Sequence, residues 1–224
     1  AAGVLLRTDT DLLTSVWPDR PALPQAQVYE HAMPHAVRPR AERLAQVRQA
    51  MAAHGATQHF VSTVDDVAWI TALRGADVEY NPIFLAHLLI DATRATLFVG
   101  AGKVGKALSQ TLAADGIQVA DYAAADAALA GLAATDVLLV DPRRITLGFR
   151  QQVAAGVKVV EAMNPSTLLK SRKLDAEAAF VRQAMIEDGA AMCEFYAWFE
   201  AAMVCGEPVS TVIEDQRLPA ARPI

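Results

Sequence analysis

Hydrophobic positions follow two periods along the chain, and together they predict alternating helices and strands through residues 40–162. Leu44 and Val47 are spaced as on one face of a helix, and Thr63 followed by Asp66 marks a second helix start. Short apolar runs predict strands at residues 58–61, 83–90, 95–99, 117–120, 137–140 and 157–160, and further helices are expected at 103–114, 123–132 and 147–155. This alternation favours an α/β domain with a mixed sheet flanked by helices.

The two ends of the chain have a different character. Residues 1–38 are irregular and rich in proline, so we expect the end of a preceding domain followed by a linker. After Pro165 the pattern predicts one long helix at residues 175–204, with apolar positions at helical spacing. We therefore expect a middle α/β domain at residues 39–166 and the start of a further domain at residues 167–224.

Composition and charge narrow the class of protein. The chain has 224 residues, of which 53% are hydrophobic and 20% charged, which is typical of a globular protein. Its net charge of −5 gives no electrostatic attraction to phosphates, so no nucleic acid partner is expected. No apolar run approaches the roughly 20 residues that cross a bilayer, so no membrane partner is expected either.

The two cysteines point to a reducing compartment. Cys193 and Cys205 lie in the predicted long helix, where the helical rise separates them by roughly 18 Å. A disulfide tolerates Cα atoms only about 7 Å apart, so these two thiols cannot pair with each other. We expect the protein to be cytoplasmic.

One glycine motif is compatible with nucleotide binding. The sequence Gly-Ala-Gly-Lys-Val-Gly at residues 100–105 lies between a predicted strand and a predicted helix, and Asp121 follows at the end of the next strand. This arrangement is typical of a dinucleotide-binding turn. The alternative is a simple glycine-rich turn, because the motif follows a hairpin-like strand pair and no second mononucleotide-binding half comes after it. An NAD-binding oxidoreductase fragment therefore stays as one hypothesis.

Other catalytic signatures are missing from the sequence. No Cys, His or carboxylate cluster has the spacing of zinc ligands, and the serines lack the G-x-S-x-G pattern. His31 and His35 are separated by Pro34, which interrupts the helix that would bring them together. We expect no catalytic residue and no metal ligand in this chain.

The segment at residues 65–82 concentrates charged and aromatic side chains, and it reads DDVAWITALRGADVEYNP. A purely structural interpretation places the two acids at the positive end of a helix dipole, Trp69 in the core, and Arg74 in a salt bridge with Asp77.

The same segment resembles the middle domain of long-form Xaa-Pro aminopeptidases (aminopeptidase P), whose pattern is D-E-I-A-W-L-x-N-L-R-G-x-D-V-x-Y-N-P. Eleven positions match: Asp65, Ala68, Trp69, Leu73, Arg74, Gly75, Asp77, Val78, Tyr80, Asn81 and Pro82. Two further stretches agree. WPDRP at residues 17–21 looks like the end of the family's first domain, and residues 173–191 look like the helix that opens its catalytic domain.

The resemblance implies a fold and an activity. Members of this family have two ribonuclease-H-like α/β domains, of the creatinase N-terminal type, before a pita-bread catalytic domain. They are metallo-exopeptidases that remove the N-terminal residue before a penultimate proline, with two divalent metals, usually manganese, held by two Asp, one His and two Glu. We expect these ligands to lie beyond Ile224. The chain would then be a non-catalytic part ending in the first long helix of a truncated pita-bread domain, inactive alone and without its own cofactor.

The resemblance also supplies site candidates and partners. Asp66, Arg74 and Asn81 are expected to face the substrate, which would be a short peptide with a penultimate proline, and a homo-oligomer is possible. An acid and an arginine suit the charged ends of such a peptide. An alternative is a metal-free module that binds peptides or proteins on the same scaffold, as in histone chaperones with a pita-bread fold.

Overall fold

The computed structural model describes residues 12–213 and 216–217. Their central feature is a mixed sheet of six strands in the order β6-β5-β4-β2-β7-β8. The strands are β2 (Gln58–Val61), β4 (Ala86–Ile90), β5 (Ala95–Val99), β6 (Ile117–Asp121), β7 (Val137–Val140) and β8 (Lys158–Glu161). Strand β4 runs antiparallel to both β2 and β5, and the other neighbouring pairs are parallel. The predicted α/β class with a mixed sheet is confirmed.

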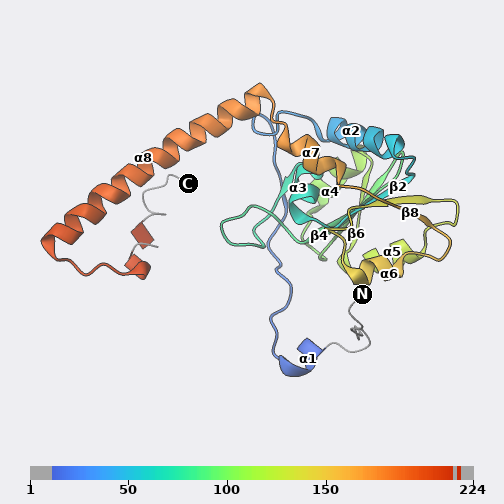
Figure 1. Cartoon of the computed structure of the whole chain (residues 1–224), viewed down its shortest axis with the longest axis horizontal. Helices are drawn as coiled ribbons and strands as arrows, with labels where there is room; N and C mark the ends of the chain where they lie inside the picture. The colour runs from blue at the N-terminus through green and yellow to red at the C-terminus, as the bar shows by residue number, and fades with distance from the viewer. Residues whose placement is uncertain (1–11, 214–215, 218–224) are drawn as a thin grey trace, which may run out of the picture.

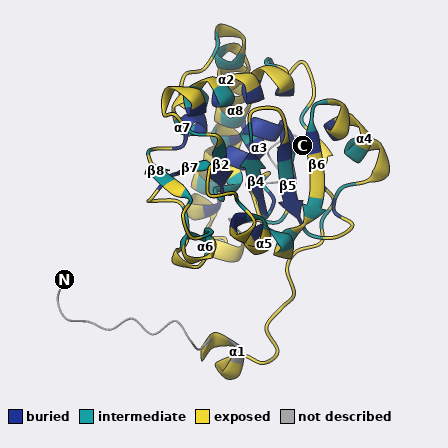
Figure 2. Cartoon of the chain, turned by 90° about the vertical axis from the view of Figure 1, so that its right-hand side faces the viewer, coloured by how far each residue is buried: buried dark blue, intermediate teal, exposed yellow. Residues whose placement is uncertain are grey.

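Helices cover both faces of this sheet (Figure 1). One face carries α2 (Arg40–Ala53), α3 (Val64–Thr71), α4 (Lys106–Ala114) and α7 (Pro165–Ser171), whose apolar residues join one core cluster. The other carries α5 (Ala125–Ala130) and α6 (Leu147–Gln152), which pack on a second cluster. Figure 2 shows that the central strands are mostly buried, whereas the edge strands β6 and β8 and the outer sides of the helices are largely exposed. The sheet therefore has an apolar layer on each side.

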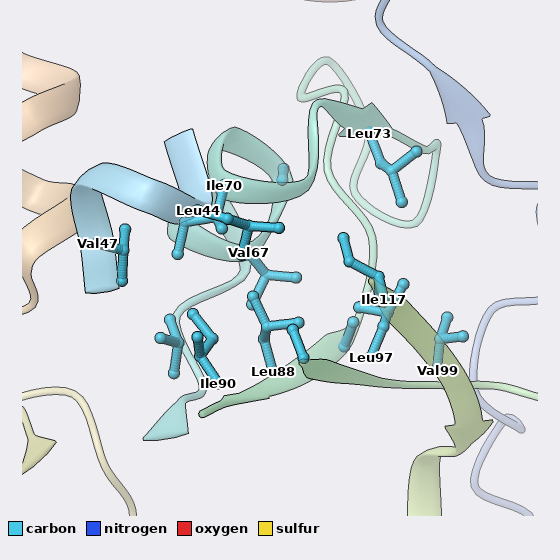
Figure 3. Packing of buried hydrophobic residues seen from close by; sticks show 14 of the residues in the cluster. Leu44, Val47, Val67, Ile70, Leu73, Leu88, Ile90, Leu97, Val99 and Ile117 are labelled. Carbon is cyan, nitrogen blue, oxygen red and sulfur yellow. The ribbon is translucent and has the colours of Figure 1, made fainter. Parts of the chain in front are cut away.

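The larger core lies between α2, α3 and the sheet (Figure 3). Leu44, Val67 and Leu88 are fully buried in it. Successive residues of a strand point to opposite faces, so Val61 enters this cluster while Phe60 enters the other. A sheet buried on both faces explains why its strands read as short continuous apolar runs in the sequence.

The sequence predictions differ from the structure in several places. The strand predicted at residues 83–90 begins only at Ala86, because Ile83 turns back and its carbonyl accepts a hydrogen bond from the Asp77 amide at 3.2 Å. The helix predicted at 123–132 is divided into a 3₁₀ turn, η1 (Tyr122–Ala124), and the short α5. Helix α7 was missed, since its seven residues are too few to show a periodic pattern.

Part of the expected linker packs on the domain. After α1 (Leu12–Val16), strand β1 (Tyr29–Glu30) pairs antiparallel with β3 (Leu73–Arg74). Two further bonds fix the chain just before β1: the Val28 amide donates to the Lys103 carbonyl at 2.9 Å, and Gln27 Nε2 donates to the Gly102 carbonyl at 2.9 Å. The segment beside β1 is thus held by hydrogen bonds to the domain. The proposed domain boundary at residue 38 comes later in the chain than these contacts.

Helix α8 (Asp175–Cys205) extends away from the sheet as a long arm (Figure 1). Its start contacts the domain where the His35 and Phe180 rings lie 4.9 Å apart. Farther along, most of its residues are exposed. Cys193 and Cys205 are unpaired, as predicted, and both are exposed. Within the described residues, no helix has both the length and the apolar character required to cross a membrane.

Candidate functional site

A pocket of about 660 Å³ lies where α3, the loop after β3 and the α7–α8 junction meet. It is lined by Asp65, Trp69, Arg74, Asn81, Pro82, Ile83, Thr167, Lys170, Ser171, Lys173 and Glu177. Five of these side chains carry charge, so the pocket offers both cations and carboxylates to a ligand. Two of the three predicted substrate-facing residues, Arg74 and Asn81, lie in its wall.

The third candidate, Asp66, is buried beneath α7. Adjacent residues of a helix point about 100° apart, so Asp65 lines the pocket with Trp69 one turn later while Asp66 turns inward and is only 1% exposed. Its Oδ2 accepts hydrogen bonds from Asn164 Nδ2 at 3.2 Å and from Thr167 Oγ1 at 3.3 Å. Asp66 therefore holds α7 against α3, and Asp65 is the acid that a ligand would meet.

Lys170 connects the two acids. Its Nζ donates to Asp65 Oδ2 and lies 3.1 Å from Asp66 Oδ1. Burial acts to lower the pKa of Lys170, but the hydrogen bond and charge of the two carboxylates outweigh it and raise that pKa above its ordinary value. For Asp65, burial acts to raise the pKa, and the bond to Lys170 reverses the effect and lowers it. Both groups are therefore charged at neutral pH.

Arg74 has unused donors beside the pocket. Its Nη1 donates to the carbonyls of Ala68 at 3.2 Å and Leu73 at 2.9 Å. No carboxylate among the described residues forms a salt bridge with it. Asp77, its partner in the structural interpretation, pairs with Lys103 instead, so the predicted Arg74–Asp77 salt bridge was wrong. Burial lowers the pKa of Arg74, opposed by nearby Tyr29, but an arginine stays protonated and suits a carboxylate.

Asn81 is placed by a tight turn. Its amide donates to the Val78 carbonyl at 3.2 Å, and these two residues form a short antiparallel bridge. Tyr80 between them has a φ of 59°, which few non-glycine residues adopt, and its side chain is 80% exposed. The turn carries Asn81 and Pro82 back to the pocket.

Sequence reasoning missed four charged pocket residues: Asp65, Lys170, Lys173 and Glu177. A signal existed for the first, because Asp65 and Trp69 are four residues apart and share a helix face. None existed for the others, since they come from α7 and the start of α8, far from α3 in the sequence.

The described residues do not fit a divalent metal site. No group of three or more His, Cys, Asp or Glu side chains lies close enough, within residues 12–213 and 216–217, to hold a metal ion. The acids of the pocket are instead paired with Lys170 or, for Glu177, accept a hydrogen bond from the Leu174 amide at 2.8 Å.

The glycine motif forms the turn from β5 to α4. A Cβ on Gly100 would lie 3.1 Å from Lys103 Cδ, so this glycine leaves room for the lysine side chain. One carboxylate oxygen of Asp121 is engaged within the chain, since its Oδ1 accepts a hydrogen bond from the Ala123 amide at 2.9 Å. The lysine side chain therefore accounts for Gly100, and the bond to Ala123 accounts for one oxygen of Asp121, without a bound nucleotide.

The mixed sheet with a helical layer on each face is the fold of a creatinase-like N-terminal domain. The chain belongs to the creatinase/prolidase N-terminal domain family, whose model matches residues 19–177.

Curated relatives are named as peptidases. Over 213 residues the chain is 31% identical to the probable Xaa-Pro aminopeptidase P of Aspergillus oryzae, covering 90% of this chain and 32% of that protein. Over 210 residues it is 28% identical to the protein of the same name from Trichophyton verrucosum, covering 90% and 30%. The chain thus spans about a third of the length of these relatives.

A solved structure shares the fold. It is the X-prolyl aminopeptidase of Caenorhabditis elegans, described as a cytosolic enzyme with a di-nuclear active site. It superposes with a TM-score of 0.88 at 18% identity and covers 95% of this chain and 35% of that protein. At this identity the likeness establishes the fold.

Proposed function

We propose that the protein carrying this chain is an Xaa-Pro aminopeptidase and that this chain is a non-catalytic part of it, forming one wall of the peptide-binding cleft. The observation that carries the proposal is the pocket in which Arg74 has no salt-bridge partner among the described residues. It is supported by the match to Xaa-Pro aminopeptidases P over 90% of the chain.

The pocket suits the two charged ends of a short peptide. The Arg74 guanidinium can donate two parallel hydrogen bonds to a terminal carboxylate, with Lys173 adding positive charge. Asp65 and Glu177 supply negative charge for an ammonium group, and Trp69 offers an apolar surface. Fixing one end of the peptide orients its scissile bond toward catalytic groups elsewhere in the protein. Asn81 adds an amide at the rim, and Asp66 acts through Lys170.

The metal chemistry is assigned to the rest of the protein. We propose that two divalent ions, expected to be manganese, would be held by ligands outside the described residues and would supply the activation of water for hydrolysis. The residues of this chain then bind and orient the peptide. A cytoplasmic location is also proposed, supported by the neighbour described as cytosolic, and self-association stays a proposal.

The test compares two peptides in the complete protein that contains this chain. A tripeptide with proline in its second position should lose its N-terminal residue at least about ten times faster than one with alanine there. Chelation should abolish the reaction, and Mn²⁺ should restore it. The 224-residue chain alone is the control and should be inactive.

Peptide binding that does not depend on Mn²⁺, without hydrolysis by the complete protein, would support the metal-free module instead. A rise of the melting temperature with NAD would support the nucleotide hypothesis.

A further inference from the structure

Lys103, the charged residue of the glycine-rich turn, is buried and joins three segments of the chain. Its side chain is 2% exposed, and its Nζ donates to Asp77 Oδ2, whose side chain is 0% exposed, and to the Pro24 carbonyl at 3.3 Å. Its own carbonyl accepts from the Val28 amide. The turn after β5 is thus bonded to the loop after β3 and to the segment before β1.

Asp77 closes the base of that loop. Its Oδ2 also accepts a hydrogen bond from the Leu85 amide at 2.7 Å, and its own amide donates to the Ile83 carbonyl at 3.2 Å. The Gly75 amide donates to the Pro82 carbonyl at 3.3 Å. Asp77 is therefore the point at which both arms of the loop at residues 75–83 meet.

The returning arm of this loop belongs to the peptide pocket. Asn81, Pro82 and Ile83 line it together with Arg74, which precedes the loop directly. The atoms of the ion pair itself do not line the pocket. A displacement of the loop base would thus move three pocket residues without removing any of them.

A buried ion pair contributes less to stability than its short contact suggests, because both charges lose their hydration. Removing one partner leaves the other charge uncompensated, so the carboxylate of Asp77 would move toward water. Its Oδ1 is buried and has no hydrogen-bond partner among the described residues, so the ammonium of Lys103 is the main compensation for its charge. The position of the loop therefore depends on this lysine.

We propose that Lys103 is a positioning residue of the peptide pocket: by binding Asp77 it holds the loop at residues 75–83 where Asn81 and Pro82 form the pocket wall. The inference rests on the proposed function. It also gives the glycine motif a role, since Gly100 has no Cβ where the lysine stem crosses it.

The test replaces Lys103 by methionine, which keeps the length of the stem and removes the charge. In the complete protein, amide hydrogen exchange at Asp77 and Leu85 should accelerate at least about tenfold, with exchange in α2 unchanged. The KM for a proline peptide should rise at least about fivefold while kcat changes less than about twofold, because the reacting groups are untouched. Lys103→Arg retains the charge and should recover part of the KM.

The matched control is Lys106→Met, which removes an exposed lysine three residues away and should change neither measurement. Should Lys103→Met fail to fold, Asp77→Asn is the second variant. It keeps the shape of the side chain and an oxygen that accepts from the Leu85 amide, and it should show the same changes in exchange and KM on a smaller scale. Unchanged exchange at Asp77 and Leu85 would overturn the inference, and so would faster exchange with an unaltered KM. A wild-type protein without peptidase activity would refute the proposed function, and hydrogen exchange alone would then decide whether Lys103 holds the loop.

Discussion

Asn164 donates a hydrogen bond from Nδ2 to Asp66 Oδ2 across 3.2 Å, although the two residues are 98 positions apart in the sequence. Each is 1% exposed. The bond joins the first turn of α3 to the start of α7, and α7 carries Lys170 to the rim of the pocket. Asp66 therefore fixes the position of α7, and with it the position of Lys170 in the pocket wall, without lining the pocket itself.

We predict that Asp66→Ala lowers the free energy of unfolding of this chain by about 3 kcal/mol, because it removes the buried acceptor that Asn164 and Thr167 share and one of the two carboxylates beside Lys170. Urea unfolding measures this difference. Asp65→Ala is the matched control: its side chain is 52% exposed, so the loss should stay within about 1 kcal/mol. Equal losses for the two variants would contradict the assignment of Asp66 to a supporting role.

The two aspartates also show what the sequence could predict. The helix at residues 64–71 and its start follow from local periodicity, and so do most of the strands, since each depends on neighbouring residues. Which aspartate faces the pocket depends on where α7 packs, and seven residues that begin with Pro165 contain too little pattern to place that helix. The same holds for Asp77, whose partner Lys103 lies 26 positions away.

We predict that Arg74→Ala in the complete protein raises the KM for short proline peptides at least about tenfold while the melting temperature changes by less than about 3 °C. Arg74 bonds only two carbonyls in the described structure, so its loss breaks no ion pair there. Arg94→Ala, at an exposed turn, is the control and should leave the KM unchanged. A large fall in melting temperature with unaltered kinetics would show that Arg74 is structural.

Gly75→Ala is predicted to disturb the pocket loop. An added Cβ would lie 2.7 Å from the Cβ of Phe84, which is fully buried, and 3.2 Å from the Ile83 carbonyl oxygen, so the backbone must move. We expect a loss of about 2 kcal/mol in the free energy of unfolding, measured with urea. Gly105→Ala meets nothing within 4 Å and should cost less than about 1 kcal/mol. The prediction fails when both substitutions have the same effect.

The final prediction concerns pH. His87 is 7% exposed, and its ring lies 4.6 Å from the Phe149 ring and 4.7 Å from the Tyr122 ring. Neither ring nitrogen has a hydrogen-bond partner in the described part of the chain. Burial lowers the pKa of His87 to about 4, against the opposing charge of Asp126. The unfolded chain, with an ordinary histidine pKa of about 6.5, binds this proton more readily.

Stability should therefore fall as the pH is lowered from about 6.5 to about 4, because the proton binds preferentially to the unfolded state in that range. A shift of this size corresponds to at most about 3 kcal/mol, and residual access of water to the ring reduces the expected contribution to about 2 kcal/mol.

His87→Phe keeps an aromatic ring beside Phe149 and Tyr122 and should remove this part of the stability lost in acid, as measured by urea unfolding at pH 7 and pH 4. His59, whose pKa burial also lowers to about 4, remains in both proteins and contributes equally to each. His54→Gln, at an exposed position, is the control and should lose as much unfolding free energy between pH 7 and pH 4 as the wild type does. The prediction is contradicted when the free energy of unfolding falls equally between pH 7 and pH 4 in His87→Phe and in the wild type. Such a result would mean that the charged His87 ring is tolerated beside Phe149 and Tyr122, although its nitrogens have no hydrogen-bond partner among the described residues.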